Sequence, residues 1–340
     1  MSRFLEVTNL NVTFPTEDGD VHASNEVSYS VGLGETLAIV GESGSGKSVS
    51  NLAVMGLHNP VRTKISGTAT LNLADGPVEL ISALPETVRR LRGKAMSMIF
   101  QDPMSALHPF FSIGDQIAEA WHLYNKGSKD DGIKKAIEML DLVGIPDPDR
   151  RVHDYPHQFS GGMRQRAMIA MALVNNPSLL IADEPTTALD VTVQSQILQL
   201  LKDLQREFNM AIILITHDLG VVAEVADRIC VMYGGRIVED GTVEDIFYRP
   251  EHPYTLGLLN SVPRITHGSS HRLRAIPGQP PSLINLPAGC AFEPRCGYAK
   301  KVSSGACTAQ VPALSDKGSG HLSRCHLDVV DLSNLVKDKA

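Results

Sequence analysis

The sequence lacks any apolar run near the roughly 18 residues that a membrane-spanning helix needs. Its longest apolar stretches, 178–182 and 211–216, are the length of single strands. The N-terminal segment MSRFLEVTNL also lacks the apolar centre of a signal peptide. We therefore expect a cytoplasmic chain, whose membrane role, where it has one, comes through partner proteins.

An excess of basic residues is absent too. The 340 residues carry 31 Lys and Arg against 38 Asp and Glu, a formal net charge of −7. Proteins dedicated to nucleic-acid binding usually present a basic face, so nucleic acid is not an expected partner. The 43% of hydrophobic and 20% of charged residues are typical of a globular protein with one large or two smaller domains.

Cysteine is scarce and unevenly placed. Of five cysteines, Cys230 lies in the apolar run RICVMY and is typical of a buried core residue. The other four lie close to the C-terminus: Cys290, Cys296, Cys307 and Cys325. A reducing cytoplasm disfavours disulfides, which turns attention to metals. The spacing C-x5-C-x10-C-x17-C lacks the C-x2-C pair of zinc ribbons. The residues alone leave a metal and no metal as the alternatives.

A phosphate-binding loop is the most specific motif. A short apolar strand over 36–40 runs into GESGSGKS at 41–48, and a helical segment follows, which is the context that G-x-x-x-x-G-K-[ST] requires. Glycines let the backbone wrap phosphates with its N–H groups inward. The candidate nucleotide ligands are Gly41, Ser43, Gly44, Gly46, Lys47 and Ser48. We expect Lys47 to reach the β- and γ-phosphates of ATP and the Ser48 hydroxyl to coordinate Mg²⁺.

The stretch FSGGMRQRAMIAMALVNNPSLLIADEPTTALD, at 159–190, combines two further signals. A helix opens there with three small residues: Ser160, Gly161 and Gly162. Free N–H groups and the dipole at a helix N-terminus suit a phosphate. A buried strand follows and ends in Asp183 and Glu184. Of two such carboxylates, one is placed to hold Mg²⁺ and the other to activate water.

Single residues at two more strand ends extend this candidate site. Gln101 follows the apolar strand AMSMIF, and His217 follows the apolar strand over 211–216. Continuously apolar strands alternating with helices predict a parallel sheet, which binds ligands at the carboxyl ends of its strands. We expect Gln101 to touch Mg²⁺ or the attacking water and His217 to sense the γ-phosphate. Phe14, ahead of the loop, either stacks on adenine or belongs to a hairpin core.

Composition predicts the domain organisation. Residues 3–14 alternate loosely, and together with the segment up to the glycine turn at 32–34 they predict an antiparallel β subdomain. The proline-rich region 102–158 carries two helical patches and predicts a helical subdomain inserted between two strands of the core. Near residue 250 the composition shifts to Pro, Gly and His. We therefore expect a nucleotide-binding domain over 1–249 and a small Cys-containing domain over 250–340.

In their order along residues 3–250, these motifs resemble the ATP-binding subunits of ABC transporters. The match consists of the P-loop, the Q-loop residue Gln101, the signature FSGGMRQR, the Walker B run SLLIADE, the D-loop at 188–190 and the switch residue His217. The resemblance implies an α/β fold: a P-loop NTPase cassette with a RecA-like parallel-sheet core, an antiparallel β subdomain and a helical insertion.

The resemblance also implies residue roles. Two subunits of this family sandwich two ATP molecules, each between one P-loop and the partner's signature. Glu184 is then the general base, His217 orients water and γ-phosphate, and Asp190 couples the two sites. Asp183 and Ser48, with Gln101 nearby, hold Mg²⁺.

A narrower resemblance is to the oligopeptide/dipeptide import branch, which includes nickel importers. It is carried by RGKAMSMIFQDPMSALHP, by RPEHPYTLGLLNSVP and by the tail IPGQPPSLINLPAGCAFEPRC. In some members of that branch four tail cysteines ligate an iron–sulfur cluster, so the resemblance implies a [4Fe–4S] cluster on Cys290, Cys296, Cys307 and Cys325, with zinc or no metal as the alternatives. It implies an ATPase that powers uptake of di- or oligopeptides from the cytoplasmic face of the membrane. The implied partners are a second ATPase subunit, expected to be a paralogue, two permease subunits that dock on the 102–158 region, and an extracytoplasmic solute-binding protein. Import of nickel or another small solute, and a soluble ABC ATPase without a transport role, are the alternatives.

Overall fold

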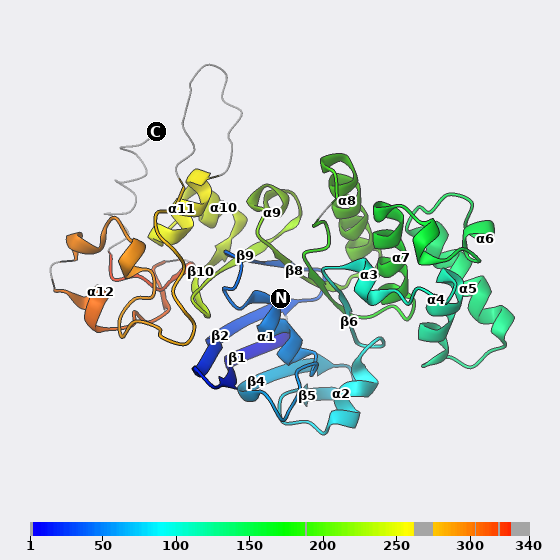
Figure 1. The fold of residues 1–340 in the computed structure, drawn as a ribbon, viewed down its shortest axis with the longest axis horizontal. Coiled ribbons are helices and arrows are strands. Elements are labelled where there is room, and N and C mark those ends of the chain that lie inside the picture. The colour runs from blue at the N-terminus through cyan, green and yellow to red at the C-terminus, as the bar shows by residue number, and fades with distance from the viewer. Residues whose placement is uncertain (1–2, 188, 262–274, 303, 319, 328–340) are drawn as a thin grey trace, which may run out of the picture. The chain divides into compact units, whose positions relative to one another are not determined.

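A computed structural model describes residues 3–187, 189–261, 275–302, 304–318 and 320–327 (Figure 1). The described chain forms two compact units. The signature unit comprises the described parts of Met1–Phe4, Val31–Thr36 and Ser82–Ile215. The P-loop unit comprises those of Leu5–Ser30, Leu37–Ile81 and Thr216–Ala340. The predicted D-loop residue Ala188, and the parts 262–274 and 328–340 of the predicted C-terminal domain, lie outside the described residues.

An antiparallel sheet opens the P-loop unit, in the order β2-β1-β4-β5. In chain order its strands are β1 Arg3–Thr16, β2 Gly19–Gly32, β4 Lys64–Leu73 and β5 Gly76–Glu79. Leu5 lies opposite Leu71, and Val7 opposite Ala69. All four side chains are buried, because alternate residues of a strand point to one face. The predicted antiparallel subdomain is confirmed.

The second sheet region of this unit holds the strand that feeds the P-loop. β3, Thr36–Val40, pairs in parallel with β9, Arg228–Tyr233. β10, Arg236–Thr242, turns back antiparallel through Gly234-Gly235, which take left-handed φ angles of 55° and 77°. β9 and β10 therefore form a hairpin. The remaining elements are α1 Lys47–Val54, α9 Leu219–Val225, α10 Val243–Tyr248, α11 Pro253–Ser261, α12 Ala306–Ala309, β11 Ser315–Asp316 and β12 Leu322–Ser323.

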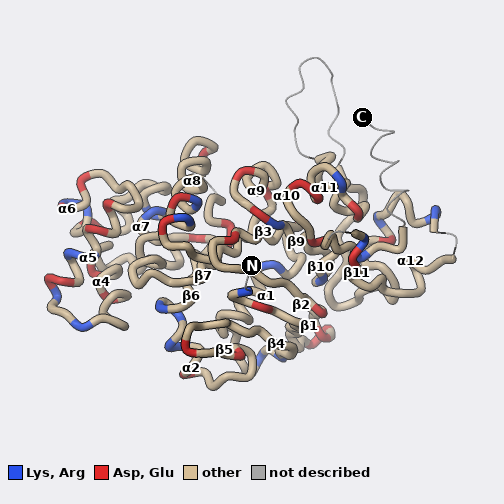
Figure 2. The backbone as a smooth tube through the Cα atoms, turned by 180° about the vertical axis from the view of Figure 1, so that it is seen from behind, with Lys and Arg blue, Asp and Glu red and all other residues tan. Residues whose placement is uncertain are grey.

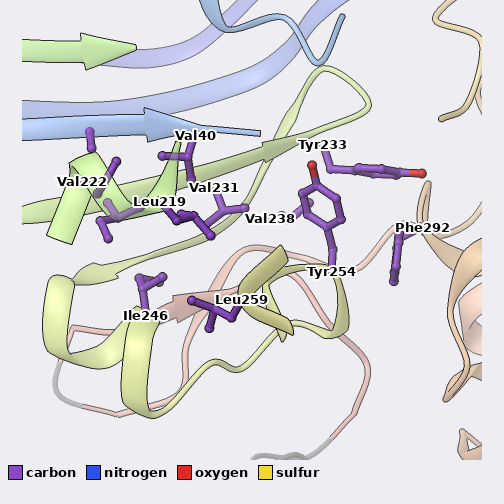
Figure 3. Close-up of a cluster of buried hydrophobic side chains, with 12 residues drawn as sticks. Val40, Leu219, Val222, Val231, Tyr233, Val238, Ile246, Tyr254, Leu259 and Phe292 are labelled. Carbon is purple, nitrogen blue, oxygen red and sulfur yellow. The ribbon is translucent and has the colours of Figure 1, made fainter. Parts of the chain in front are cut away.

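One hydrophobic cluster joins these elements to the C-terminal extension, by which we mean the described residues from 250 onward (Figure 3). Val40 and Val231 from the strands are in the same cluster as Tyr254 and Leu259 of α11. Phe292 closes it, with its ring centroid 5.2 Å from that of Tyr233. The domain boundary predicted near residue 250 stays a prediction. Residues before and after that point belong to the same hydrophobic cluster.

The signature unit contains three parallel strands, β6 Met96–Ile99, β7 Leu179–Asp183 and β8 Ala211–Thr216. β7 pairs with both others, so that Ile181 lies beside Met98 and Ile213. Every residue of the three strands is buried, as expected for parallel strands covered on both faces. The parallel-sheet prediction is confirmed.

Helices make up most of the rest of this unit. They are α2 Pro85–Leu91, α3 Pro103–Ala106, α4 Ile113–His122, α5 Lys129–Leu142, α6 Pro148–Arg151, α7 Gly161–Leu173 and α8 Val191–Phe208. Ser112 caps α4, and Ser128 with Asp131 forms a capping box on α5, which explains where the two predicted helical patches begin. Figure 2 shows basic and acidic residues interspersed along α4 to α6. No helix of the described chain combines the length and the apolarity that crossing a bilayer would take.

Candidate nucleotide-binding site and cysteine pocket

The P-loop needs glycine at its two ends. A Cβ atom on Gly41 would lie 2.2 Å from the Met232 carbonyl oxygen, and one on Gly46 would lie 2.0 Å from that of Ala23. Gly46 also has a φ of 99°, a conformation that residues with side chains rarely adopt. Neighbouring backbone therefore excludes a side chain at both positions. The absence of a side chain lets the loop pack tightly against the β9–β10 hairpin.

The loop leads into α1 with its binding groups presented. No side chain caps α1, whose N-cap is Gly46, and the N-terminus of a helix suits an anion. Lys47 is 5% exposed, and its amine donates to the carbonyl oxygens of Gly41 at 2.8 Å and Glu42 at 3.0 Å. The half-buried Ser48 follows in the first turn of the helix, while Ser43 and Gly44 are exposed at the tip of the loop.

The carboxylate pair lies at the end of β7 in the signature unit. Asp183 is buried at 7% exposure, whereas Glu184 is half-buried. Glu184 has a φ of 46°, although the N–H group still donates to the Ile215 carbonyl oxygen at 2.9 Å. A left-handed φ in a residue with a long side chain stores strain of about 1–3 kcal/mol, and such residues concentrate at functional sites.

Two side chains orient the Glu184 carboxylate. Its Oε2 accepts hydrogen bonds from Gln101 Nε2 at 3.1 Å and from Thr187 Oγ1 at 2.8 Å. Gln101 is exposed and lies just beyond β6. Gln101 and Glu184, predicted from the sequence to belong to one site, are in contact. Thr187 was missed; its position three residues after Glu184, in a turn, is the signal that was available.

The signature presents an exposed helix N-terminus. Ser160 caps α7, with its hydroxyl accepting from the Met163 N–H at 3.3 Å. Gly162 packs so closely on α8 that a Cβ atom there would lie 2.8 Å from Val193 Cγ1. Asp190 caps α8 by accepting from the Val193 N–H at 2.9 Å. Signature and D-loop are therefore packed as one structural block.

The two remaining predicted residues lie in the P-loop unit. His217 is exposed and follows β8. Phe14 is half-buried on β1, and its ring meets that of His58 edge-on at 5.4 Å. For Phe14, both adenine stacking and a place in the hairpin core stay predictions. The role of His217 stays a prediction too. Gln101 and Glu184 are in contact within the signature unit, and the full set of site residues stays a prediction.

The C-terminal extension supplies P-loop contacts that the sequence analysis missed. The Tyr254 hydroxyl accepts from the Glu42 N–H at 2.9 Å. The Arg295 guanidinium forms a two-point ion pair with the Glu42 carboxylate, with nitrogen–oxygen distances of 2.7 and 3.0 Å. The hydrogen bonds to the Glu42 carboxylate raise the pKa of Arg295 above its ordinary value, although burial opposes this. The sequence separation of 253 residues left no local signal of this pair.

All four C-terminal cysteines line one small pocket, together with Phe292 and Leu327: Cys290, Cys296, Cys307 and Cys325. Burial, with a smaller effect of the neighbouring thiols, raises the pKa of Cys290 to about 11 and that of Cys325 to about 12. Cys230, by contrast, is fully buried in β9, as predicted. Within the described ranges, no three His, Cys, Asp or Glu side chains form a group that could hold a metal ion.

Comparison with known proteins agrees with this geometry. Residues 24–187 match the ABC transporter family, and residues 238–302 match the family described as "Oligopeptide/dipeptide transporter, C-terminal region". The chain is 50% identical to the oligopeptide transport ATP-binding protein OppD of Salmonella typhimurium, over 96% of this chain and 95% of that protein. It is 49% identical to the dipeptide transport ATP-binding protein DppD of Bacillus subtilis, over 96% and 95% of the two chains.

Solved structures give the same fold. The dimeric ATP-binding cassette MJ0796, in a post-hydrolysis state with ADP and Pi, superposes with a TM-score of 0.62 at 26% identity, covering 70% of this chain and 98% of that one. CbiO1 of Clostridium perfringens superposes with a TM-score of 0.61 at 28% identity, covering 76% and 96%. The chain is therefore an ABC-type ATPase, and it belongs to the family of oligopeptide/dipeptide transport ATP-binding proteins.

Proposed function

We propose that this chain hydrolyses ATP at a site formed by its own P-loop and carboxylates together with a second subunit's signature, and thereby powers peptide uptake through an ABC importer. The proposal rests on Glu184. Its backbone has a strained, left-handed φ angle, and its carboxylate is oriented by two hydrogen bonds. A general base must be held in one orientation to take a proton from water, and that geometry is built in here.

The proposed roles follow the chemistry of phosphoryl transfer, which depends mainly on positioning and charge neutralisation. Lys47 and the N–H groups of α1 hold the β- and γ-phosphates. Asp183 and Ser48 supply oxygen ligands to Mg²⁺, a hard cation that prefers such donors. Glu184 takes the proton of the attacking water, and His217 orients that water and the γ-phosphate.

The signature serves a different nucleotide in this proposal. Ser160, Gly161 and Gly162 expose the N-terminus of α7 toward solvent, where a second subunit's ATP would meet it. Asp190 is packed against the same block and links it to the neighbouring site. The signature and α7 thus couple two ATP sites rather than completing one.

A substitution series at the base tests the ATPase proposal. Glu184→Gln keeps the side-chain shape but cannot take the proton, so turnover should fall at least about 100-fold while MgATP still binds. Glu207→Gln, an exposed position on α8, is the matched control and should hydrolyse ATP at the normal rate. Undiminished hydrolysis by Glu184→Gln would refute the assignment of the base.

Partners in the membrane are proposed from an exposed apolar patch in the helical region. Phe110 is 82% and Phe111 55% exposed, and the His108 ring lies 4.8 Å from that of Phe111. Clustered exposed aromatics of this kind mark protein interaction sites. We propose that two permease subunits dock here, placing the chain at the cytoplasmic face of the membrane. A second ATPase subunit, proposed to be a paralogue, and an extracytoplasmic solute-binding protein complete the assembly.

The carried solute is proposed to be a di- or oligopeptide, with Ni²⁺ as the second candidate. Uptake of labelled peptides and of Ni²⁺ should be compared in cells with the wild-type gene and with Glu184→Gln. Peptide uptake that depends on Glu184 supports the first reading, and nickel uptake alone would replace it.

For the cysteine pocket we propose a [4Fe–4S] cluster. Support comes from the pocket, whose lining contains all four thiols, the number of cysteine ligands that such a cluster takes. When bound, such a cluster would act as a covalent staple for the extension. Anaerobic purification followed by iron and sulfide assays tests this. A colourless, iron-free protein would contradict it, and zinc in the same sample would support the alternative.

A further inference from the structure

Arg295 reaches the P-loop from the C-terminal extension and is almost fully enclosed there. Its side chain is 5% exposed, against 28% for that of Glu42. Beyond the two bonds to Glu42, it donates to the Tyr233 hydroxyl at 3.2 Å and to the Pro277 carbonyl oxygen at 2.9 Å. An arginine fork held at four points is a fixed part of the structure, unlike a surface pair that exchanges with water.

The partner of Arg295 is itself immobilised. The Glu42 N–H donates to Tyr254, and the Glu42 carbonyl oxygen accepts from the Lys47 amine. The residue that follows the first glycine of the loop is therefore held by its side chain, its N–H group and its carbonyl group. Two of these three contacts come from the extension.

Charge gives this arrangement a consequence for ATP. A free carboxylate in a phosphate-binding loop repels a polyanionic nucleotide, since like charges close together raise each other's energy. The Arg295 guanidinium cancels the Glu42 charge at direct contact distance. The loop can then present its N–H groups and Lys47 without opposition.

We propose that Arg295 is a positioning residue for the nucleotide: it orients Glu42 and neutralises it, so that the C-terminal extension sets the affinity of the P-loop for MgATP and MgADP. This inference rests on the proposed ATP site, but it adds a residue outside the ATPase motifs.

The cysteine pocket anchors the segment that carries Arg295. A short 3-10 helix, Glu293–Arg295, lies between Cys290 and Cys296. Its first N–H group donates to the Cys290 carbonyl oxygen at 2.9 Å, and the Cys296 N–H donates back to Glu293 at 3.1 Å. The extension's pocket and the P-loop are thus connected through a single helical turn.

A charge cycle tests the proposal. MgADP binding is titrated calorimetrically on the full chain for wild type, Arg295→Gln, Glu42→Gln and the double variant, at low and high salt. Loss of a charged hydrogen-bond pair predicts an about 10- to 100-fold weaker Kd for Arg295→Gln. The double variant should recover most of this loss, because the repelling carboxylate is gone. Added salt should shrink the deficit of Arg295→Gln, since it screens the exposed charge.

Controls separate this from folding and from the proposed function. Arg249→Gln removes a comparable ion pair, with Asp245, from an arginine that is 66% exposed, and should bind MgADP normally. Thermal melts identify variants that fail to fold; if Arg295→Gln fails, Glu42→Gln and the double variant are compared with wild type. Wild-type binding by Arg295→Gln, or a double variant as weak as it, overturns the inference. A wild-type chain that does not bind MgADP overturns the proposed ATP site instead.

Discussion

Phe292→Ala should unfold the P-loop unit at a markedly lower temperature. Phe292 is 4% exposed, and its ring packs against Tyr233 at 5.2 Å and Tyr254 at 5.4 Å between centroids. Truncating a buried phenylalanine costs about 3–5 kcal/mol, of which each aromatic pair contributes roughly 0.5–1.5 kcal/mol. For a unit of roughly 150–250 residues this corresponds to a Tm decrease of about 6–20 °C.

The assay is thermal unfolding followed by circular dichroism at one fixed scan rate, because unfolding of a chain of this size is expected to be irreversible. Phe110→Ala is the matched control, since that ring is 82% exposed and its loss should change Tm by no more than about 2 °C. Phe292→Leu should fall between the two. Equal melting of Phe292→Ala and Phe110→Ala would show that the extension does not share the core of the P-loop unit.

Three further predictions each concern contacts that lie inside a single unit. Burial opposes the charged form of His321, but Glu239 and the carboxylates around it raise the pKa of the ring above 6.5. The protonated ring therefore stabilises the fold fully below about pH 6.5, and this stability is lost as pH rises through the folded pKa. His321→Gln should consequently flatten the Tm–pH profile. Gly162→Ala should push α7 off Val193, lowering stability by about 1–3 kcal/mol and slowing hydrolysis with nucleotide binding retained; adding Val193→Ala should restore both, and no rescue would refute the steric account. Thr187→Val should slow turnover about 10-fold by removing one hydroxyl donor from the proposed base, and an unchanged kcat would remove Thr187 from the site.

The sequence was sufficient where chemistry is encoded in consecutive residues. The P-loop at 41–48 has glycine at positions 41 and 46, where a side chain would strike backbone, and continuously apolar strands are typical of buried parallel strands. Ser112, Ser128 and Asp190 cap the helices that follow them, which is also a local effect. Each of these signals acts over a few residues, so one sequence taken by itself is enough to reveal them.

Long-range partners were not readable, because nothing near a residue in sequence specifies what folds against it. The left-handed Glu184, its donor Thr187 and the Arg295–Glu42 pair emerge only when strands and extension pack together. Convergence of four unevenly spaced cysteines on one pocket is likewise a product of folding. By itself the sequence determined that this protein binds and hydrolyses ATP with a known set of motifs. The tertiary structure alone decided that its C-terminal extension completes the core behind the P-loop and carries the charge that balances it, since burial and ion pairing depend on distance in space and not along the chain.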